Sequence, residues 1–190
     1  MAKVMIVYAT DYGSTKKMAE KVAQGVESVP GAEALVRTAE EATAEEVLSA
    51  DALVLGSPVH MGSVDWRVKR FIDQVCSGLW MGDKAVGRVG AVFVSGSGFG
   101  NAGGGCELAM LAMLNNLVEL GLIIVPLPKN TQGYPKGGLQ WGPYGRSMTE
   151  ALEPIEGGVP EERIEAAFFH GANVARVAEA VKGKELLKTA

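Results

Sequence analysis

Apolar and polar residues alternate along this chain in blocks that predict strands separated by helices. Short apolar runs, each bounded by polar or glycine-containing segments, are typical of buried strands. We expect strands at residues 3–9, 33–38, 51–58, 88–96 and 122–128. Between these runs, apolar residues recur every three or four positions, which is typical of helices that bury one face. We expect helices at residues 15–29, 43–50, 64–79, 108–118 and 160–182.

This regular alternation favours a doubly wound α/β fold. Parallel strands are joined by crossover connections that usually contain a helix, so the pattern predicts a five-stranded parallel sheet with helices on both faces. We see no internal repeat or interdomain linker, and we expect one domain over residues 1–190. Residues 127–159 differ, because they carry seven glycines, four prolines and the aromatic residues Tyr134, Trp141 and Tyr144. We expect a long loop whose aromatic side chains cover a cleft or a partner.

The composition is that of an ordinary globular protein, with 47% apolar and 21% charged residues. The net charge is −4 and no segment concentrates lysine and arginine, so we expect neither nucleic acid nor an anionic membrane as a partner. No apolar run reaches the ~18 residues that crossing a bilayer requires, and the first residues lack the pattern of a secretory signal, so we expect a cytoplasmic protein. Two cysteines and two histidines predict no disulfide framework and no metal site.

Candidate chemistry lies where the predicted strands end. In an open parallel sheet, ligands bind beyond the carboxyl ends of the strands. Three segments at that edge, 10–15, 56–63 and 95–105, are rich in glycine and hydroxyl side chains. The first leads directly into a helix, whose N-terminal amide groups and dipole favour an anion. We predict that a phosphate binds there, to the hydroxyls of Thr10, Ser14 and Thr15 and to the amides of 11–15.

Other nucleotide and hydrolase motifs are absent or misplaced. The chain has no P-loop sequence and no G-x-S-x-G elbow. A G-x-G-x-x-G match at 98–103 follows the fourth predicted strand and not the first, so we interpret it as chance. A phosphate loop beside two glycine-rich loops fits flavin mononucleotide (FMN), whose ring would lie flat at the sheet edge. Asp11 is unexpected in such a loop because a carboxylate repels a phosphate, and we expect it to point outward.

Several stretches together resemble one family. Residues 10–15, followed by Lys17-Met18-Ala19, resemble the phosphate loop of flavodoxin-like proteins. Gly78-Leu79-Trp80 and Gly142-Pro143-Tyr144-Gly145 are similar to the WrbA family of FMN-dependent NAD(P)H:quinone oxidoreductases, and the resemblance runs over roughly 3–182. It implies a flavodoxin-like sheet with strand order 2-1-3-4-5, a homotetramer arranged as a dimer of dimers, and two-electron reduction of quinones.

The resemblance also implies which residues form the site. The FMN phosphate would lie on residues 10–15 and the ring against 58–62 and 95–100. The predicted FMN-binding residues are Thr10, Asp11, Tyr12, Gly13, Ser14, Thr15, Pro58, Val59, His60, Met61, Gly62, Ser95, Gly96, Ser97, Gly98, Phe99 and Gly100. NAD(P)H and quinone would share a pocket formed by Tyr12, Tyr144 and Trp80, the last from a neighbouring subunit. The flavin carries the chemistry, and we predict no catalytic side chain.

Three departures from the family pattern concern the substrate side. The connection between the second and third predicted strands is short, and Leu120 stands where the family often has a histidine. The glycine loop at 98–105 is longer than in many members. Two other functions stay open at this point. One is a flavodoxin-type electron carrier that binds FMN without NAD(P)H:quinone activity of its own. The other is a structural protein of this fold that has lost its cofactor.

Overall fold

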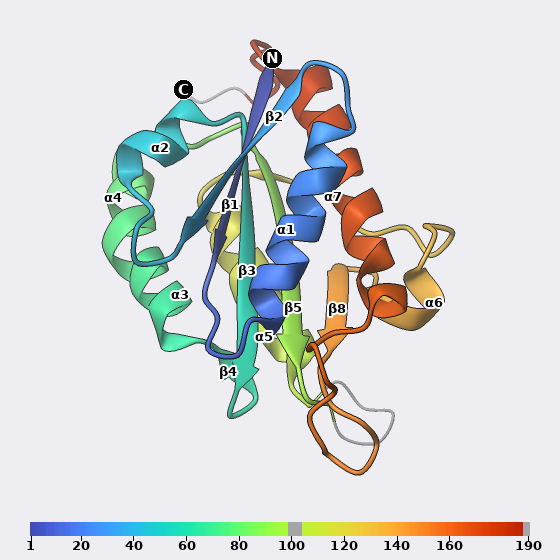
Figure 1. Ribbon diagram of the computed structural model, residues 1–190. Helices are drawn as coiled ribbons and strands as arrows, with labels where there is room; N and C mark the ends of the chain where they lie inside the picture. The colour runs from blue at the N-terminus through green and yellow to red at the C-terminus, as the bar shows by residue number, and fades with distance from the viewer. Residues whose placement is uncertain (99–103, 188–190) are drawn as a thin grey trace.

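The computed structural model describes residues 1–98 and 104–187, which form a sheet between two layers of helices (Figure 1). The strands are β1 (Ala2–Tyr8), β2 (Ala32–Thr38), β3 (Ala52–His60), β4 (Ser63–Val64), β5 (Val89–Gly96), β6 (Ile123–Ile124), β7 (Gly138–Leu139) and β8 (Gly142–Arg146). The helices are α1 (Ser14–Glu27), α2 (Ala44–Ser49), α3 (Trp66–Phe71), α4 (Ser77–Trp80), α5 (Cys106–Glu119), α6 (Tyr134–Gly137) and α7 (Glu161–Val181). A π-helical turn, η1 (Ile72–Cys76), joins α3 to α4.

The sheet has the order β2-β1-β3-β5-β8-β7, and its central pairs β2–β1, β1–β3 and β3–β5 are parallel. Alternate residues of each central strand face opposite layers, as the two-residue period of a strand requires. Met5 and Val7 of β1 pack in the core under α3 and α5, whereas Val4 and Ile6 pack in the core under α1 and α7. The predicted doubly wound fold is therefore confirmed, with the first four strands in their predicted order.

The fifth strand differs from the prediction. We expected one strand at 122–128, but only Ile123–Ile124 pair with the start of β5. Pro126 and Pro128 have no N–H to donate to a ladder, so the strand does not continue. The end of β5 pairs instead with β8, which comes from the long segment 127–159. That segment is thus partly ordered as α6, β7 and β8, and two short strands share the fifth position.

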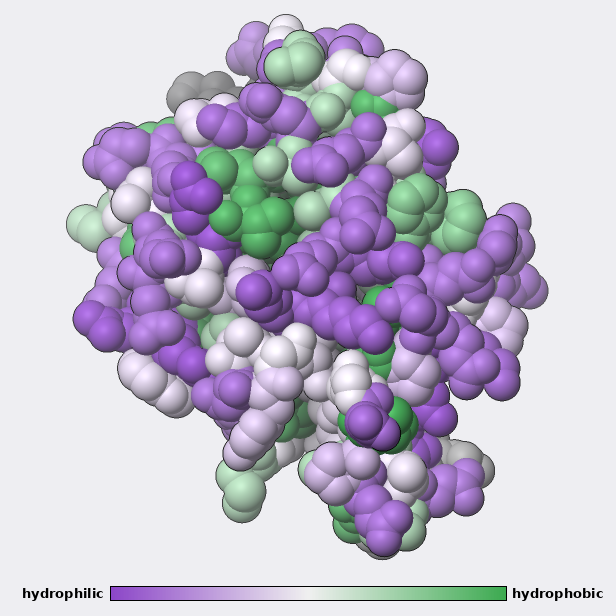
Figure 2. All heavy atoms as spheres, in the orientation of Figure 1, coloured by the Kyte–Doolittle hydropathy of each residue, from purple (hydrophilic) through white to green (hydrophobic). Residues whose placement is uncertain are grey.

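The helices agree with the hydrophobic pattern at most positions. The helix expected at 64–79 is divided by η1, and α5 buries Met110, Met113 and Leu117 against the sheet while Leu108 stays 65% exposed. Among the described residues, no helix is both long and apolar enough to cross a membrane. Figure 2 shows that hydrophilic side chains cover most of the face that carries α1, with apolar areas between them.

Candidate functional site

A pocket of about 830 Å³ opens at the carboxyl ends of β1, β3 and β5. Its walls include all three loops that the sequence singled out: residues 10–15, 58–60 and 95–97. A fourth wall comes from residues 147–158, which follow β8. The volume lies within the range of pockets that bury a small-molecule ligand or cofactor. The pocket therefore occupies the position where this class of sheet binds ligands.

The loop between β1 and α1 has the geometry of an anion site. Gly13 takes a left-handed conformation (φ +85°) just before α1, and none of the described side chains caps that helix N-terminus. The hydroxyl of Thr10 accepts a hydrogen bond from the Gly13 amide (3.0 Å), which closes the loop. The N-terminal amide groups of α1 thus have no side-chain acceptor, and such groups bind anions readily.

Thr15 connects this loop to β5. Its side chain is buried, and its hydroxyl lies 2.7 Å from that of Ser95, also buried. Each hydroxyl can donate one hydrogen and accept others, so this contact leaves one of the two free to donate to a ligand. On the other side of the loop, Gly158 approaches Ser14 so closely that an added Cβ would lie 3.1 Å from the Ser14 hydroxyl. The loop is therefore held between β5 and the 147–158 wall.

The structure brings most of the predicted cofactor residues together and leaves some outside. Met61 and Gly62 form the turn between β3 and β4, and neither they nor Gly98 line the pocket. Phe99 and Gly100 lie outside the described residues. Tyr12 lies at the pocket with its side chain 93% exposed. The pocket residues that we did not single out are Ser147, Met148, Pro154, Ile155, Gly157 and Gly158, and only the unusual composition of 127–159 pointed to them.

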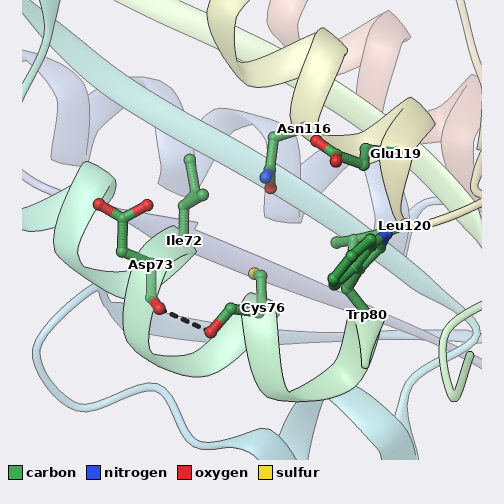
Figure 3. Close-up of a pocket in the computed structure, with 8 residues that line it drawn as sticks. Ile72, Asp73, Cys76, Trp80, Asn116, Glu119 and Leu120 are labelled. Carbon is green, nitrogen blue, oxygen red and sulfur yellow. Dashed lines mark hydrogen bonds between the residues drawn. The ribbon is translucent and has the colours of Figure 1, made fainter. Parts of the chain in front are cut away.

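Trp80 and Tyr144 lie away from this pocket. Tyr144 is on β8, and burial raises the pKa of its hydroxyl to about 12. Trp80, at the end of α4, lines a separate cavity of about 180 Å³. Figure 3 shows that cavity between η1, which carries Cys76, and α5, which carries Asn116. Leu120, the departure from the family pattern, also lines it and does not reach the large pocket.

The two cysteines are both buried. Burial raises the pKa of each thiol to about 12, with smaller contributions from nearby carboxylates. Cys76 and Cys106 are therefore protonated at neutral pH and poorly suited to nucleophilic or redox chemistry.

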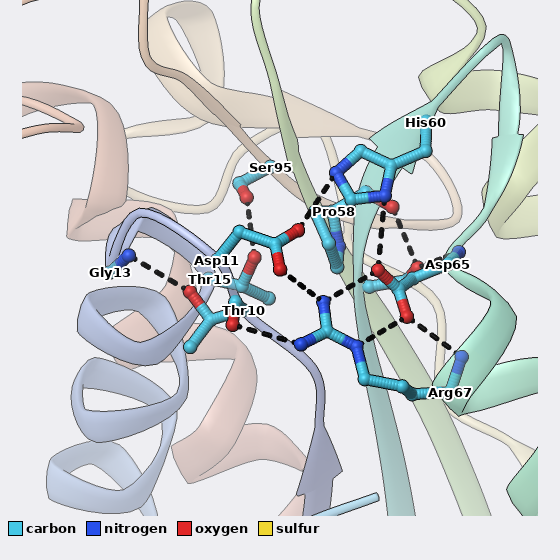
Figure 4. A network of polar contacts seen from close by, with 10 residues as sticks. Thr10, Asp11, Gly13, Thr15, Pro58, His60, Asp65, Arg67 and Ser95 are labelled. Carbon is cyan, nitrogen blue, oxygen red and sulfur yellow. Dashed lines mark hydrogen bonds and ion pairs between the residues drawn. The ribbon is translucent and has the colours of Figure 1, made fainter.

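A cluster of four ionisable side chains stands beside the loop between β1 and α1 (Figure 4). Asp65, fully buried at the N-cap of α3, accepts hydrogen bonds from Arg67 through both carboxylate oxygens. Arg67 also donates to the Asp11 carboxylate at 2.8 Å. The His60 ring lies between the two carboxylates, with Nε2 3.2 Å from Asp11 and Nδ1 3.0 Å from Asp65. The sequence pattern did not indicate Asp65 and Arg67, because they follow the loop at 56–63 instead of lying in it.

The electrostatics of this cluster are dominated by the Asp65–Arg67 pair. Burial raises the pKa of the Asp65 carboxyl, but the hydrogen bonds and charge of Arg67 outweigh burial and hold that pKa below its usual value. Hydrogen bonding to Asp65 raises the pKa of Arg67 further above its already high value. Asp11, His60 and Asp65 also place three potential metal-ligand atoms within 4.8 Å of one another. Arg67 supplies a compensating positive charge to both carboxylates, so the cluster does not require a metal.

Comparisons with known proteins agree with this geometry. Residues 5–81 match the family model described as a flavodoxin domain. An NAD(P)H dehydrogenase (quinone) of Sinorhizobium fredii is 36% identical over 208 residues, covering 94% of this chain and 98% of that protein. A flavodoxin of Aquifex aeolicus is 43% identical over 124 residues, covering 65% of this chain and 64% of that protein.

Solved structures give the same picture. A flavodoxin, WrbA-like protein from Agrobacterium tumefaciens superimposes with a TM-score of 0.71 at 25% identity, covering 96% of this chain and all of that one (100%). A flavodoxin from the domain Archaea has a TM-score of 0.66 at 18% identity, which supports the fold alone.

Proposed function

The chain belongs to the family of NAD(P)H dehydrogenases (quinone), and from that premise we propose that it is an FMN-dependent enzyme that transfers electrons from NAD(P)H to a quinone. The observation that carries the proposal is the pocket of about 830 Å³ whose walls include the uncapped N-terminus of α1. When bound, FMN would supply the redox chemistry, accepting a hydride from NAD(P)H and passing two electrons to the quinone. The protein would supply binding, orientation and electrostatics.

The residues at the α1 end of the pocket fit a phosphate. The amide groups that begin α1 have no side-chain cap, and the hydroxyls of Ser14 and Thr15 stand beside them. We propose that these groups, with Thr10, hold the FMN phosphate. Gly13 contributes through its backbone, because its left-handed conformation is one that glycine adopts without strain.

The remaining walls suit a flat aromatic ring. Pro58 and Val59 offer apolar surface, while Gly96 packs so closely that an added Cβ would lie 3.2 Å from Val59. We propose that the FMN ring lies against 58–60 and 95–97. The exposed Tyr12 side chain would pack against the ring or the nicotinamide. NAD(P)H and quinone would use the same space in turn, which predicts ping-pong kinetics.

We also propose the homotetramer, a dimer of dimers, that the family resemblance implies. Apolar side chains stand exposed on α4 and α5, among them Trp80 (51%), Leu108 (65%) and Val118 (58%). Large apolar side chains clustered on a surface are typical of protein interfaces. Trp80 does not line the pocket of its own chain, so it would close the pocket of a neighbouring subunit. We place the protein in the cytoplasm, where two free buried cysteines are common.

An absorption spectrum of the purified protein, followed by anaerobic titration with NADH and NADPH, tests this function. We expect a flavin spectrum that either nucleotide bleaches and that benzoquinone restores. FMN-loaded protein that does not oxidise NAD(P)H in the presence of benzoquinone would exclude the proposed enzyme.

A double variant tests the phosphate site separately. Ser14→Ala with Thr15→Ala should weaken FMN binding about tenfold or more, since two donors next to the helix end are lost. Ser28→Ala, at the opposite end of α1, is the control and should bind FMN like the parent. Unchanged FMN affinity in the double variant would remove the phosphate-site assignment.

A second candidate is an electron carrier, which the similarity to the Aquifex flavodoxin favours. A carrier would accumulate a one-electron-reduced flavin in a dithionite titration and would not be reduced directly by NAD(P)H. The same titrations therefore separate the two functions.

A further inference from the structure

We propose that His60 and Arg67, organised by Asp65, neutralise the Asp11 carboxylate so that an acidic phosphate loop can bind a phosphate dianion. His60 is thereby a positioning and charge-compensating residue, not a catalytic one. The inference rests on the proposed binding of FMN and adds a shared electrostatic function for Asp11, His60, Asp65 and Arg67 at the edge of that site. It also accounts for the aspartate that seemed out of place in the loop.

Side chains at the end of β3 and in the segment that follows it contact the Asp11 carboxylate. One carboxylate oxygen accepts from Arg67 at 2.8 Å, and the other lies 3.2 Å from His60 Nε2. Figure 4 shows the carboxylate turned toward Arg67 and His60, on the opposite side from Gly13. Arg67 also donates to the backbone carbonyl of Thr10 at 3.3 Å, so the guanidinium holds both the main chain and the side chain of the loop.

Asp65 fixes both cationic partners. Its carboxylate accepts from the Arg67 side chain at 2.8 and 2.9 Å and lies 3.0 Å from His60 Nδ1. It also accepts from the Arg67 backbone amide, while the Asp65 amide donates to the buried Ser57 hydroxyl. Because Asp65 is fully buried and bonded on several sides, it fixes the direction in which Arg67 and His60 point toward Asp11.

The charge of the cluster depends on His60. Two carboxylates and one guanidinium sum to −1 with a neutral imidazole and to zero with an imidazolium. An ionised carboxylate can only accept, so both ring contacts are hydrogen bonds only when both ring nitrogens carry a hydrogen. The charged groups that face the ring among the described residues are Asp11 and Asp65, with Arg67 bonded to both. A net charge of −1 within a Debye length, about 10 Å, of a bound phosphate would oppose binding.

His60→Gln tests the compensation, because glutamine keeps a polar side chain but removes the positive charge. FMN dissociation constants are measured by quenching of flavin fluorescence at pH 7 and low salt, in the parent and in an Asp11→Asn background. We expect His60→Gln to weaken FMN binding about fivefold in the parent. With Asp11→Asn we expect less than twofold, because an asparagine amide can donate to a ring nitrogen that carries no hydrogen, so the ring need not be charged there. Asp11→Asn alone should bind FMN at least as tightly as the parent, since asparagine still offers an oxygen to Arg67.

Two further measurements separate charge compensation from a direct contact or a structural role. Riboflavin lacks the phosphate, so His60→Gln should change its affinity less than twofold. The difference in FMN affinity between His60→Gln and the parent should also shrink when the salt concentration is raised, because dissolved ions screen charges near the surface. Lys69→Gln, which removes a positive charge from an exposed position on α3, is the control and should leave FMN binding unchanged.

An equal loss of FMN affinity in both backgrounds, or an equal loss for riboflavin, would show that His60 acts on the ring and would overturn the inference. Full FMN affinity in His60→Gln would overturn it as well, while leaving the proposed function intact. Failure of the parent to bind either FMN or riboflavin would instead reject the proposed function, and the inference with it. If His60→Gln does not fold, His60→Asn, which is also polar and uncharged, takes its place, and the same outcomes in the two backgrounds decide.

Discussion

Asp65 at the functional edge and His170 on α7 are both fully buried ionisable side chains, but the first is held charged and the second neutral. Burial lowers the pKa of His170 to about 4, with a smaller opposing effect from the Val92 carbonyl, so the ring is neutral at pH 7. Burial also disfavours the charged form of Asp65, but Arg67 reverses its effect. The core histidine is therefore uncharged, whereas the buried Asp65 carboxylate at the pocket edge stays charged because Arg67 is its ion-pair partner.

This difference shows where the fold tolerates charge. Moving an ion out of water without a partner costs several kcal/mol, so a buried ionisable group either becomes neutral or acquires a compensating charge. At the pocket, Asp65 has acquired a compensating charge from Arg67, and His60 lies beside it. Arg67 also pairs with Asp11 in the loop at 10–15. We therefore connect these charges with ligand binding and not with stability alone.

Arg67→Gln should have the largest effect, because it leaves Asp65 as buried as His170 but without its guanidinium. We expect the free energy of unfolding to fall by about 3–5 kcal/mol at pH 7, measured by urea denaturation of the apo-protein. Arg70→Gln, at an exposed position on the same helix where the side chain bonds only Gln74 in a neighbouring turn, is the control. It should change stability by no more than about 0.5 kcal/mol. Equal stability of the two variants would contradict the contrast between paired and unpaired buried groups.

His170→Leu examines the other side of the comparison. The folded-state pKa of about 4 lies below the ordinary value of 6.5, so only the unfolded chain takes up a proton as the pH falls between these values. The contribution of neutral His170 to the free energy of unfolding is fully present above pH 6.5. It is lost as the pH falls toward 4, by about 3 kcal/mol in total. Unfolding free energies measured at pH 7 and pH 4.5 should therefore fall less in His170→Leu than in the parent. Parallel changes in the two proteins would show that His170 is not the neutral group described.

Ser57→Ala measures how much of the Asp65 environment depends on neutral hydrogen bonds. The Ser57 hydroxyl accepts from the Asp65 amide at 2.9 Å and donates to the Pro58 carbonyl at 2.7 Å. Its removal leaves a buried amide without that acceptor, and we expect a loss of about 1–2 kcal/mol in urea denaturation. A loss as large as that of Arg67→Gln would mean that charge is not the main stabilising feature at this edge.

Lys69→Gln should have the smallest effect. Lys69 pairs with Asp73 one turn along the helix segment, and both side chains are 57% exposed. Exposed pairs of this kind contribute at most about 0.5 kcal/mol and less in salt. Denaturation at low and high salt checks this, and a loss above 1 kcal/mol, on the order of a buried interaction, would contradict the view that burial decides the value of a charge pair here.

Much of the fold was predictable because its signals are local. The apolar runs of β1, β3 and β5 reflect strands covered on both faces. A capping box between residues three positions apart begins α2. The Thr43 hydroxyl accepts from the Glu46 amide, and the Glu46 carboxylate accepts from the Thr43 amide. In the same way, the glycine and hydroxyl residues in 10–15 predicted a ligand-binding loop, and residues 10–15 do line the pocket.

What the sequence alone could not reveal are partnerships between distant segments. The pairing of both β6 and β8 with β5 depends on a chain that leaves the sheet after Ile124 and returns at Gly142, and no local pattern records such a return. The position of Trp80 outside the pocket of its own chain is likewise a matter of helix packing.

Residue type and spacing along the chain thus predicted the α/β class, the parallel sheet and a glycine- and hydroxyl-rich loop at the pocket, because each rests on interactions among near neighbours. The direction in which the Asp11 carboxylate points depends instead on the tertiary structure. Its partners His60 and Arg67 lie more than 45 residues away along the chain. The fold of the chain between β1 and β3 brings both of them within 3.2 Å of Asp11 and of buried Asp65. Electrostatic compensation depends on distance in space, which sequence separation does not report.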